Sequence, residues 1–236
     1  MTTCARIITA YFSPTNTTKT VCETIAQELS RTLGIPHESR SFTLPGERTE
    51  PLVFPEGSLV ILGMPVYAGR VPNFMLKYLA QTEGNGSMGV PIVVYGNRNY
   101  DDALIELRDI MEKAHIHTVA GGAFIGEHSF SRTLGQGRPD SQDLNKARSF
   151  AQVVASTISN DRYRTPVPVK GNVPYRPYMV PQKADGSHKT ITKVFPKVSD
   201  ACTNCGVCVS VCPLGSIAPD CHTYTTFCVK CCACVK

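Results

Sequence analysis

The sequence lacks several features that would place it in common functional classes. No basic stretch followed by an apolar run and a small-residue cleavage site opens the chain, so we predict no secretory signal. The longest uncharged apolar stretch, residues 57–69, is shorter than the roughly 20 residues that a membrane-spanning helix needs. A GxGxxG fingerprint is absent, so direct NAD binding is not supported. We expect a soluble protein with no membrane insertion.

Charged residues are scarce, at 18% of 236 residues, and they are unevenly divided. Residues 1–160 hold 14 basic and 15 acidic side chains, whereas residues 161–236 hold 10 and 4. The basic residues are scattered among prolines, without a dense run or an aromatic RNA-binding signature, so no nucleic-acid partner is expected. A basic half can instead meet an acidic protein partner.

Cysteine is nearly absent from the first 201 residues, which hold only Cys4 and Cys22. The other nine of the 11 cysteines fall between residues 202 and 236. A secreted protein stapled by disulfides would spread its cysteines through the core, so this distribution predicts a reducing, cytoplasmic location. Cys4 and Cys22 are expected to pack as small buried hydrophobic residues.

Residues 1–160 alternate short β-rich apolar runs with amphipathic helical stretches, which is typical of an α/β domain with a parallel sheet. Five strands are predicted at residues 5–12, 37–42, 58–63, 90–95 and 117–125. Apolar residues at helical spacing predict helices at residues 17–33, 73–80, 101–114 and 141–159. Residues 43–57 are expected to form a loop, and Asp101 and Asp102 are interpreted as helix caps.

Residues 161–198 contain six prolines, which block both helix and central strand. We predict an extended strap between two domains, and its tyrosines indicate that it packs along a surface. The second domain, residues 199–236, contains all nine C-terminal cysteines.

The cysteines of this second domain follow the spacing of iron–sulfur ligands. The run CxxCxxCxxxCP, with Cys202, Cys205, Cys208 and Cys212, is the pattern by which thiolates wrap a [4Fe–4S] cluster. A second run begins with Cys228, Cys231 and Cys234. Because the fourth cysteine of each run binds the other cluster in two-cluster ferredoxins, Cys212 is predicted to complete the second set. Structural zinc, which usually takes two separated CxxC pairs, fits these staggered runs poorly.

The first set then lacks a fourth ligand. The chain could be truncated after Lys236, a substitute such as Cys221 or Cys232 could serve, or the cluster could have three protein ligands. We favour truncation, because the second run otherwise ends just before its cysteine–proline pair. Cys232 falls outside the repeating spacing, so we do not expect it to bind iron.

A second group of candidate residues follows the predicted strands. Residues 13–18, Ser-Pro-Thr-Asn-Thr-Thr, open directly into the first helix, where hydroxyl and backbone N–H groups can hold a phosphate. An ordinary helix cap is the alternative interpretation. Residues 63–70 and 96–100 follow the third and fourth strands, and ligands of such sheets bind at the carboxyl ends of the strands. Each of these loops offers a tyrosine, and the pair could sandwich a planar ring.

These loops resemble those of the flavodoxins, whose phosphate loop reads Ser/Thr-x-Thr-Gly-x-Thr. More closely, the chain is similar to a family of flavodoxin-like domains fused to two-cluster ferredoxins, in which YFSPTxTT, YGNRxYDDAL, GEHS and KCCACVK recur. Here these motifs lie at residues 11–18, 95–104, 126–129 and 230–236, so the resemblance covers essentially the whole chain.

The resemblance implies a flavodoxin-like sheet domain, a compact ferredoxin module with two [4Fe–4S] clusters, and an FMN site. It places the phosphate at Ser13, Thr15, Asn16, Thr17 and Thr18. It places the ring at Pro65, Val66, Tyr67, Gly96, Asn97, Arg98, Asn99 and Tyr100. Asn16 replaces the glycine of the flavodoxin loop, and asparagine tolerates a left-handed backbone better than other residues with a side chain.

Two further side chains could act at the flavin. Arg98 would stabilise an anionic reduced flavin and raise its reduction potential, unless it points outward into solvent. His128 follows the fifth strand and could carry a proton or close over the ring, although a lone loop histidine is more often a surface residue.

We therefore expect an electron-transfer protein, associated with anaerobic metabolism, that passes electrons between its clusters and FMN within one chain. Its partners would be redox proteins, including acidic ones. One alternative is a flavin-dependent reductase of a quinone or nitro acceptor that the clusters supply with electrons. Another is a regulatory or scaffold protein whose flavodoxin-like domain holds no FMN.

Overall fold

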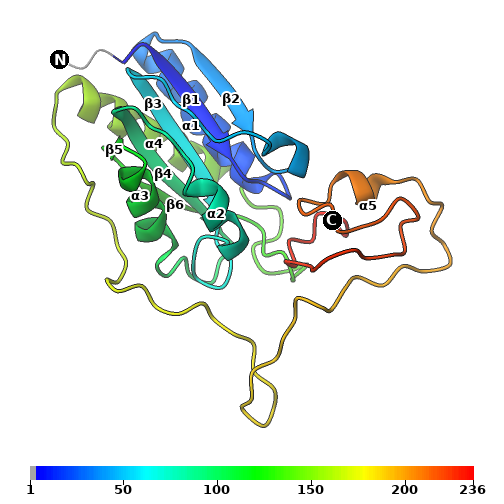
Figure 1. The fold of residues 1–236 in the computed structure, drawn as a ribbon. Helices are drawn as coiled ribbons and strands as arrows, with labels where there is room; N and C mark the ends of the chain where they lie inside the picture. The colour runs from blue at the N-terminus through cyan, green and yellow to red at the C-terminus, as the bar shows by residue number, and fades with distance from the viewer. Residues whose placement is uncertain (1–3) are drawn as a thin grey trace.

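Residues 4–236 are described by the computed structural model, and their central element is a six-stranded sheet in which every pairing is parallel (Figure 1). Its strands are β1 (Arg6–Tyr11), β2 (His37–Ser41), β3 (Ser58–Pro65), β4 (Ser87–Tyr95), β5 (Ile116–Thr118) and β6 (Gly122–Ile125). The strand order is β2-β1-β3-β4-β5, with β6 also paired to β4. This is the order of the flavodoxin-like doubly wound fold, so the predicted fold class is confirmed.

The fifth predicted strand is divided into β5 and β6. β5 pairs with residues 87–89 of β4, and β6 pairs with residues 92–95, so the interruption lies opposite Val90 and Pro91. Pro91 has no backbone N–H to donate to a neighbouring strand. The prediction of one continuous strand over residues 117–125 was therefore wrong.

Helices cover both faces of the sheet. α1 (Thr17–Leu33) and α4 (Ser141–Ser159) lie on one face, and α3 (Ala103–Lys113) lies on the other with α2 (Leu76–Leu79), which a 3-10 turn at Asn73–Met75 precedes. Alternation along the strands divides the core. Ile7 and Ile61 pack toward α1 and α4, whereas Ile8 and Leu62 pack into the opposite cluster.

The start of α3 differs from the prediction. Asp102 occupies the N-cap position, but its side chain makes no capping hydrogen bond. Its carboxylate instead accepts hydrogen bonds from Asn172 and from the backbone N–H of Arg176. Asp101 forms an ion pair with Arg98. Neither aspartate side chain caps the helix, because Arg98, three residues away, occupies the Asp101 carboxylate and the distant residues Asn172 and Arg176 occupy that of Asp102.

Between β2 and β3 the chain forms one short 3-10 turn at Pro45–Glu47, in place of a covering helix. Within residues 4–236, no helix is both long and apolar enough to cross a membrane.

The C-terminal part of the chain is built differently. The structure describes no helix or strand in residues 161–198. Residues 165–178 run along the α3 side of the sheet, and the chain then forms a projecting loop with a bridge between Gln182 and His188 (Figure 1). Residues 199–236, here called the cluster module, contain the single short helix α5 (Val207–Ser210). The module contacts the sheet domain through the Arg48 guanidinium, which donates to the Pro213 carbonyl at 2.6 Å.

Candidate functional site

The predicted phosphate loop lies at the junction of β1 and α1. Asn16 adopts φ 62°, in the left-handed region where the flavodoxin pattern has glycine, and it directly precedes α1. The Ser13 hydroxyl accepts a hydrogen bond from the backbone N–H of Lys19 at 3.0 Å, which fixes the loop against the first helical turn. That turn contains no acidic residue. Its positive end is therefore free of a charge that would repel an anion.

Thr18 provides the test of whether this loop fits a phosphate. Its Oγ1 atom is buried and has no hydrogen-bond partner. An unpaired buried hydroxyl costs free energy, so such groups usually have a partner in the functional state. Thr18 lines a cavity of about 450 Å³ together with Ser13, Thr15 and Thr17. The loop thus offers a hydroxyl that a phosphate oxygen would satisfy.

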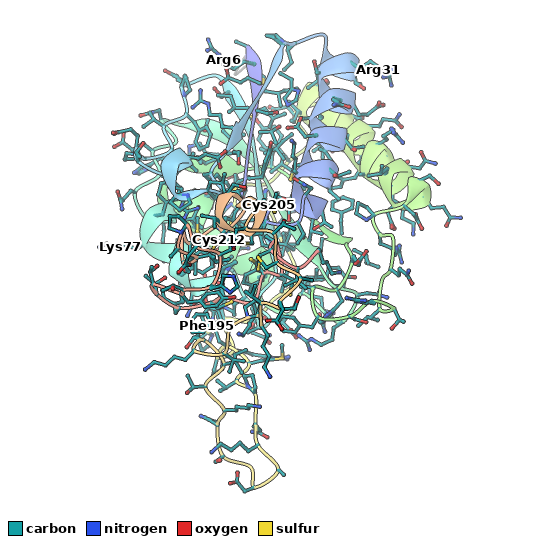
Figure 2. All side chains as sticks on the ribbon, turned by 90° about the vertical axis from the view of Figure 1, so that its right-hand side faces the viewer. Arg6, Arg31, Lys77, Phe195, Cys205 and Cys212 are labelled. Carbon is teal, nitrogen blue, oxygen red and sulfur yellow. The ribbon has the colours of Figure 1, made fainter. Side chains whose placement is uncertain are left out.

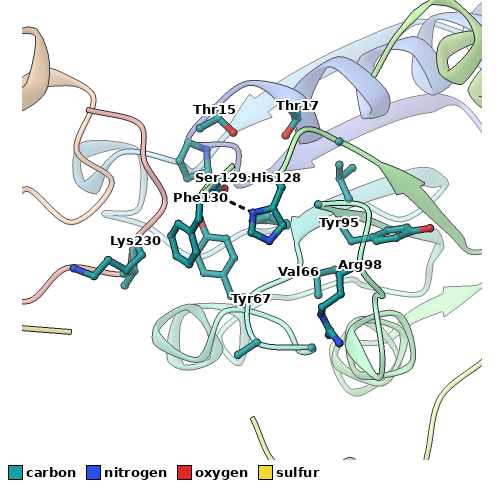
Figure 3. A pocket seen from close by; sticks show the side chains of 18 of the residues that line it. Thr15, Thr17, Val66, Tyr67, Tyr95, Arg98, His128, Ser129, Phe130 and Lys230 are labelled. Carbon is teal, nitrogen blue, oxygen red and sulfur yellow. Dashed lines mark hydrogen bonds between the residues drawn. The ribbon is translucent and has the colours of Figure 1, made fainter. Parts of the chain in front are cut away.

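The same cavity extends over the loops that follow β3 and β4, where a ring was predicted (Figure 3). The predicted ring residues that line it are Pro65, Val66, Tyr67, Gly96, Arg98 and Asn99. Its size is in the range of sites for small organic cofactors. Gly126 also lines the cavity, and a Cβ at this position would approach a Val94 methyl group at 2.9 Å. Glycine is required here by close packing.

Three predicted residues lie outside the cavity lining. Asn16 and Asn97 shape the loops through left-handed backbone conformations, at φ 62° and 57°. The Tyr100 ring packs against the Tyr95 ring, with centroids 5.5 Å apart, and contacts the core on the α3 side. Tyr95, the last residue of β4, is among the lining residues, but its ring points away from the other side chains labelled there (Figure 3). Of the two tyrosines predicted to sandwich a ring, Tyr67 and Tyr100, only Tyr67 therefore lines the cavity.

The loop after β6 supplies His128, Ser129 and Phe130 to the cavity. His128 Nδ1 accepts a hydrogen bond from the Phe130 backbone N–H at 3.2 Å, so a proton on the neutral ring resides at Nε2. Arg98 lines the cavity while its guanidinium pairs with Asp101. Part of its positive charge is therefore already balanced.

The sequence did not reveal two further parts of the wall. Met179, Val180, Pro181 and Ile191 come from the strap, and Val229 and Lys230 come from the cluster module. Tyr67 lines the cavity. Burial raises its pKa well above the usual value, and negative charge on the nearby Cys231, Cys232 and Cys228 raises this pKa further.

A second, mostly apolar cavity of about 420 Å³ lies in the cluster module. The predicted second ligand set, Cys212, Cys228, Cys231 and Cys234, lines it together with Cys232. Phe195 from the strap stacks on Tyr224 at 4.3 Å in its wall, and Figure 2 shows Cys205, Cys212 and Phe195 in this part of the molecule. Burial raises the pKa of Cys231 to about 12, so binding of iron must displace a proton from this thiol.

The two cysteine runs have matching local structures. Asn204 and Lys230 occupy equivalent positions, both with left-handed backbones, and their N–H groups donate to Cys202 Sγ and Cys228 Sγ at 3.4 Å. Hydrogen bonds to ligand sulfurs adjust cluster potentials. Cys232 occupies the position equivalent to Gly206, and both have positive φ. Its thiol donates to the Lys230 carbonyl at 3.6 Å.

Cys202, Cys205 and Cys208 of the first run lie outside the second cavity. Burial raises the pKa of Cys208, and a hydrogen bond with the Cys221 side chain raises it further. Of the two proposed substitute ligands, Cys221 therefore lies beside the first set and Cys232 beside the second. Within residues 4–236, no three metal-binding side chains converge on a single ion position. A cubane instead distributes its four thiolates over four irons. Of the remaining cysteines, Cys22 is fully buried and Cys4 is partly buried.

The strand order and the C-terminal cysteine pattern together define a flavodoxin-like α/β domain joined to a ferredoxin-type iron–sulfur segment. Comparison with protein families supports the second part, because the 4Fe-4S binding domain family matches residues 195–218. No curated protein matches the chain.

Several solved structures are similar to the sheet domain. A flavodoxin from the domain Archaea has 16% sequence identity and a TM-score of 0.44, covering 65% of this chain and 99% of its own. The flavodoxin of Megasphaera elsdenii has 14% identity and a TM-score of 0.41, covering 64% and 98%. A flavone reductase has 6% identity and a TM-score of 0.49, covering 70% and 66%. The 4Fe–4S segment on this fold indicates a role in electron transfer.

Proposed function

We propose that the protein transfers electrons between [4Fe–4S] clusters and FMN within one polypeptide. The observation that carries this proposal is a shared wall. Phe130, Val229 and Lys230 line both the cavity at the strand ends and the cysteine-lined cavity. A flavin in the first and a cluster in the second would be separated by little more than these side chains.

FMN would be held by residues that already have the required chemistry. The hydroxyls of Ser13, Thr15, Thr17 and Thr18 and the positive end of α1 would bind its phosphate. The walls at Val66 and Tyr67 would cover the isoalloxazine ring. When bound, FMN links one-electron and two-electron chemistry, which suits a partner of one-electron clusters.

We propose two [4Fe–4S] clusters. The cluster nearer the flavin would be bound by Cys212, Cys228, Cys231 and Cys234, which share one cavity. The other would be bound by Cys202, Cys205 and Cys208 with a fourth ligand.

The last residue of the cluster module contacts the loop after β6. The Lys236 ammonium pairs with Glu127 and donates to the His128 carbonyl at 3.1 Å. These contacts would keep the module close to the proposed flavin.

A reductase of small acceptors would need an opening to the flavin large enough for the acceptor. The strap and the module instead contribute Met179, Val180, Pro181, Ile191, Val229 and Lys230 to the cavity wall. This arrangement favours electron exchange with the chain's own clusters, and we place the protein among electron carriers rather than reductases. We propose redox protein partners and a cytoplasmic location.

The test begins with anaerobic protein assayed for iron, acid-labile sulfide and flavin. The clusters are then reduced rapidly by a photochemical donor, and flavin absorbance is followed over a range of protein concentrations. We expect first-order flavin reduction whose rate constant is independent of concentration. A rate constant that rises in proportion to protein concentration would mean transfer between molecules, and a preparation that contains only zinc would reject the proposal.

A further inference from the structure

The strap residues Met179, Val180, Pro181 and Ile191 form a wall of the predicted flavin cavity, although more than 100 residues separate them from the phosphate loop. A flexible linker between two domains would have no reason to line a cofactor cavity. The contacts that hold this stretch in place therefore reveal whether it is a linker or a part of the site.

Helix α3 holds the strap through two carboxylates. Asp102 accepts hydrogen bonds from the Asn172 backbone N–H at 2.9 Å, the Asn172 side chain at 2.7 Å and the Arg176 backbone N–H at 2.7 Å. The Tyr175 hydroxyl donates to Asp109. Because Asp102 is fully buried, these bonds are sheltered from water and fix the backbone of residues 172–176.

Arg70 connects the strap to the loop that carries Tyr67. Its guanidinium makes two hydrogen bonds to Glu106, at 2.8 and 2.7 Å, and a third to the Arg176 carbonyl at 2.7 Å. The rings of Tyr175 and Tyr178 lie 4.6 and 4.8 Å from the same guanidinium carbon. The side chains of Arg70 and Glu106 are only 12% and 4% exposed, so this is a buried ion pair. All three guanidinium nitrogens of Arg70 donate hydrogen bonds, which offsets the cost of burying its charge.

The strap then continues directly into the cavity wall. The Tyr178 hydroxyl donates to the Val71 carbonyl at 2.7 Å, and the Met179 backbone N–H donates to the Ala68 carbonyl at 3.0 Å. Ala68 follows Tyr67 in the loop after β3, and both line the cavity. These two hydrogen bonds join the loop after β3 directly to the strap at successive residues, Tyr178 and Met179.

We propose that residues 172–178 anchor Met179, Val180 and Pro181 as a fixed wall of the flavin site that excludes small acceptors, with Arg70 as the positioning residue. Two kinds of acceptor would be excluded. One is planar molecules such as quinones, and the other is small anionic oxidants such as ferricyanide. The inference rests on the proposed function, because it concerns the same flavin. It extends that function by assigning the choice of electron partner to the strap.

The test measures two rates on the FMN-loaded protein with its clusters intact. The first is the second-order rate constant for reoxidation of the reduced flavin by ferricyanide or a soluble quinone. The second is the first-order rate constant for electron transfer from the clusters to the flavin. A general loss of folding would lower the second rate, whereas an opened wall raises the first and leaves the second unchanged.

Tyr178→Ala removes one ring over Arg70 and the hydrogen bond to Val71, and it keeps both members of the buried ion pair. We expect reoxidation by small acceptors to become about tenfold faster, with transfer from the clusters within about twofold of wild type. Tyr178→Phe retains the ring and should remain close to wild type. Tyr163→Ala is the matched control, because Tyr163 also lies in the strap but packs on the opposite face, toward α1 and α4.

Arg70 is tested together with its partner, because removing one member of a buried ion pair leaves an uncompensated charge. Arg70→Met combined with Glu106→Gln should reproduce the faster reoxidation. Wild-type reoxidation rates in both this pair and Tyr178→Ala would overturn the inference. If the wild-type protein binds no FMN or no cluster, the proposed function itself fails, and this outcome is distinguishable in the initial cofactor assay.

Discussion

The sheet domain and the cluster module are stabilised in opposite ways. Two extensive clusters of buried apolar side chains lie on the two faces of the sheet. In residues 199–236, the buried apolar side chains are Pro213, Ile217, Cys221 and Cys231, and two of these four are cysteines. The first region can fold by burying hydrophobic surface, whereas the second needs another source of free energy.

This difference shows where cofactors enter the stability of each region. A flavin would fill a cavity that is lined mainly by loops of the already folded sheet domain. Iron–sulfur clusters would instead be part of the core of the module, so that binding and folding are coupled. Changes at cofactor residues should therefore have different consequences in the two regions.

Removal of iron should give the largest effect. Without clusters, we expect residues 199–236 to lose protection from hydrogen exchange while the strands and helices of residues 6–159 keep theirs, because only the latter have an apolar core. Hydrogen exchange followed by mass spectrometry on holo and iron-depleted protein measures this directly. Persistent protection across the module in the iron-free protein would show that the module folds without its clusters, contrary to our expectation.

Two adjacent cysteines should differ sharply. Cys231→Ser should lose about one cluster's iron, because Cys231 is a proposed ligand in the spacing that such clusters require. Cys232→Ser should keep all of it, since Cys232 occupies the position equivalent to Gly206. Iron and sulfide analysis of the two variants compares them. Equal iron loss in both would show that the module depends on the whole loop rather than on particular ligands.

In the sheet domain, Thr18→Val should weaken FMN binding about tenfold and leave the stability of the flavin-free domain unchanged or higher. The reason is that the Thr18 hydroxyl is buried without a partner until a ligand supplies one. Fluorescence titration with FMN measures the dissociation constant, and urea unfolding measures the stability of the flavin-free domain. Thr24→Val is the control on the same helix, because its hydroxyl donates to the Thr20 carbonyl. A loss of flavin-free stability in Thr18→Val would contradict this interpretation.

The smallest effect concerns pH. Hydrogen bonds from Arg138 hold the pKa of Asp143, a buried residue near the start of α4, below its usual value. A carboxyl with a lowered pKa stabilises the fold at neutral pH, and this contribution is lost as the pH falls through the lowered pKa. Asp143→Asn should therefore reduce the unfolding free energy by about 1 kcal/mol at neutral pH. Urea unfolding over a range of pH measures the difference in unfolding free energy between Asp143→Asn and wild type. This difference should shrink in acid, and a difference that stays constant would exclude the ion pair as its source.

Local patterns in the sequence predicted a large part of the sheet domain. The predicted bounds of α1 and α4 match the structure, because amphipathic spacing over many residues and clear boundaries define both helices. The division of the fifth strand was not predicted, since it depends on Pro91 in a neighbouring strand. Local sequence also could not show that Asp102 binds the strap instead of capping α3.

In the candidate site too, local sequence predicted the loops but not the contacts between distant parts of the chain. Loops that follow strands were predictable, because the carboxyl ends of parallel strands lie at one edge. The orientation of Tyr95 and Tyr100 depends on packing, and the contributions of Met179 and Lys230 depend on where distant segments return. A proline-rich composition predicted an extended segment but gave no information about the surface that it would contact.

The anchoring of the strap also sets the length of the remaining tether. Met179 is bound to the sheet domain, and Thr192 is bound to the cluster module through the backbone N–H of Cys228 at 2.8 Å. About 12 residues between them would span roughly 20 Å if flexible. A module that detached would remain at an effective concentration in the millimolar range. A freely diffusing carrier that competes for the same face would therefore have to bind much more tightly than the module does.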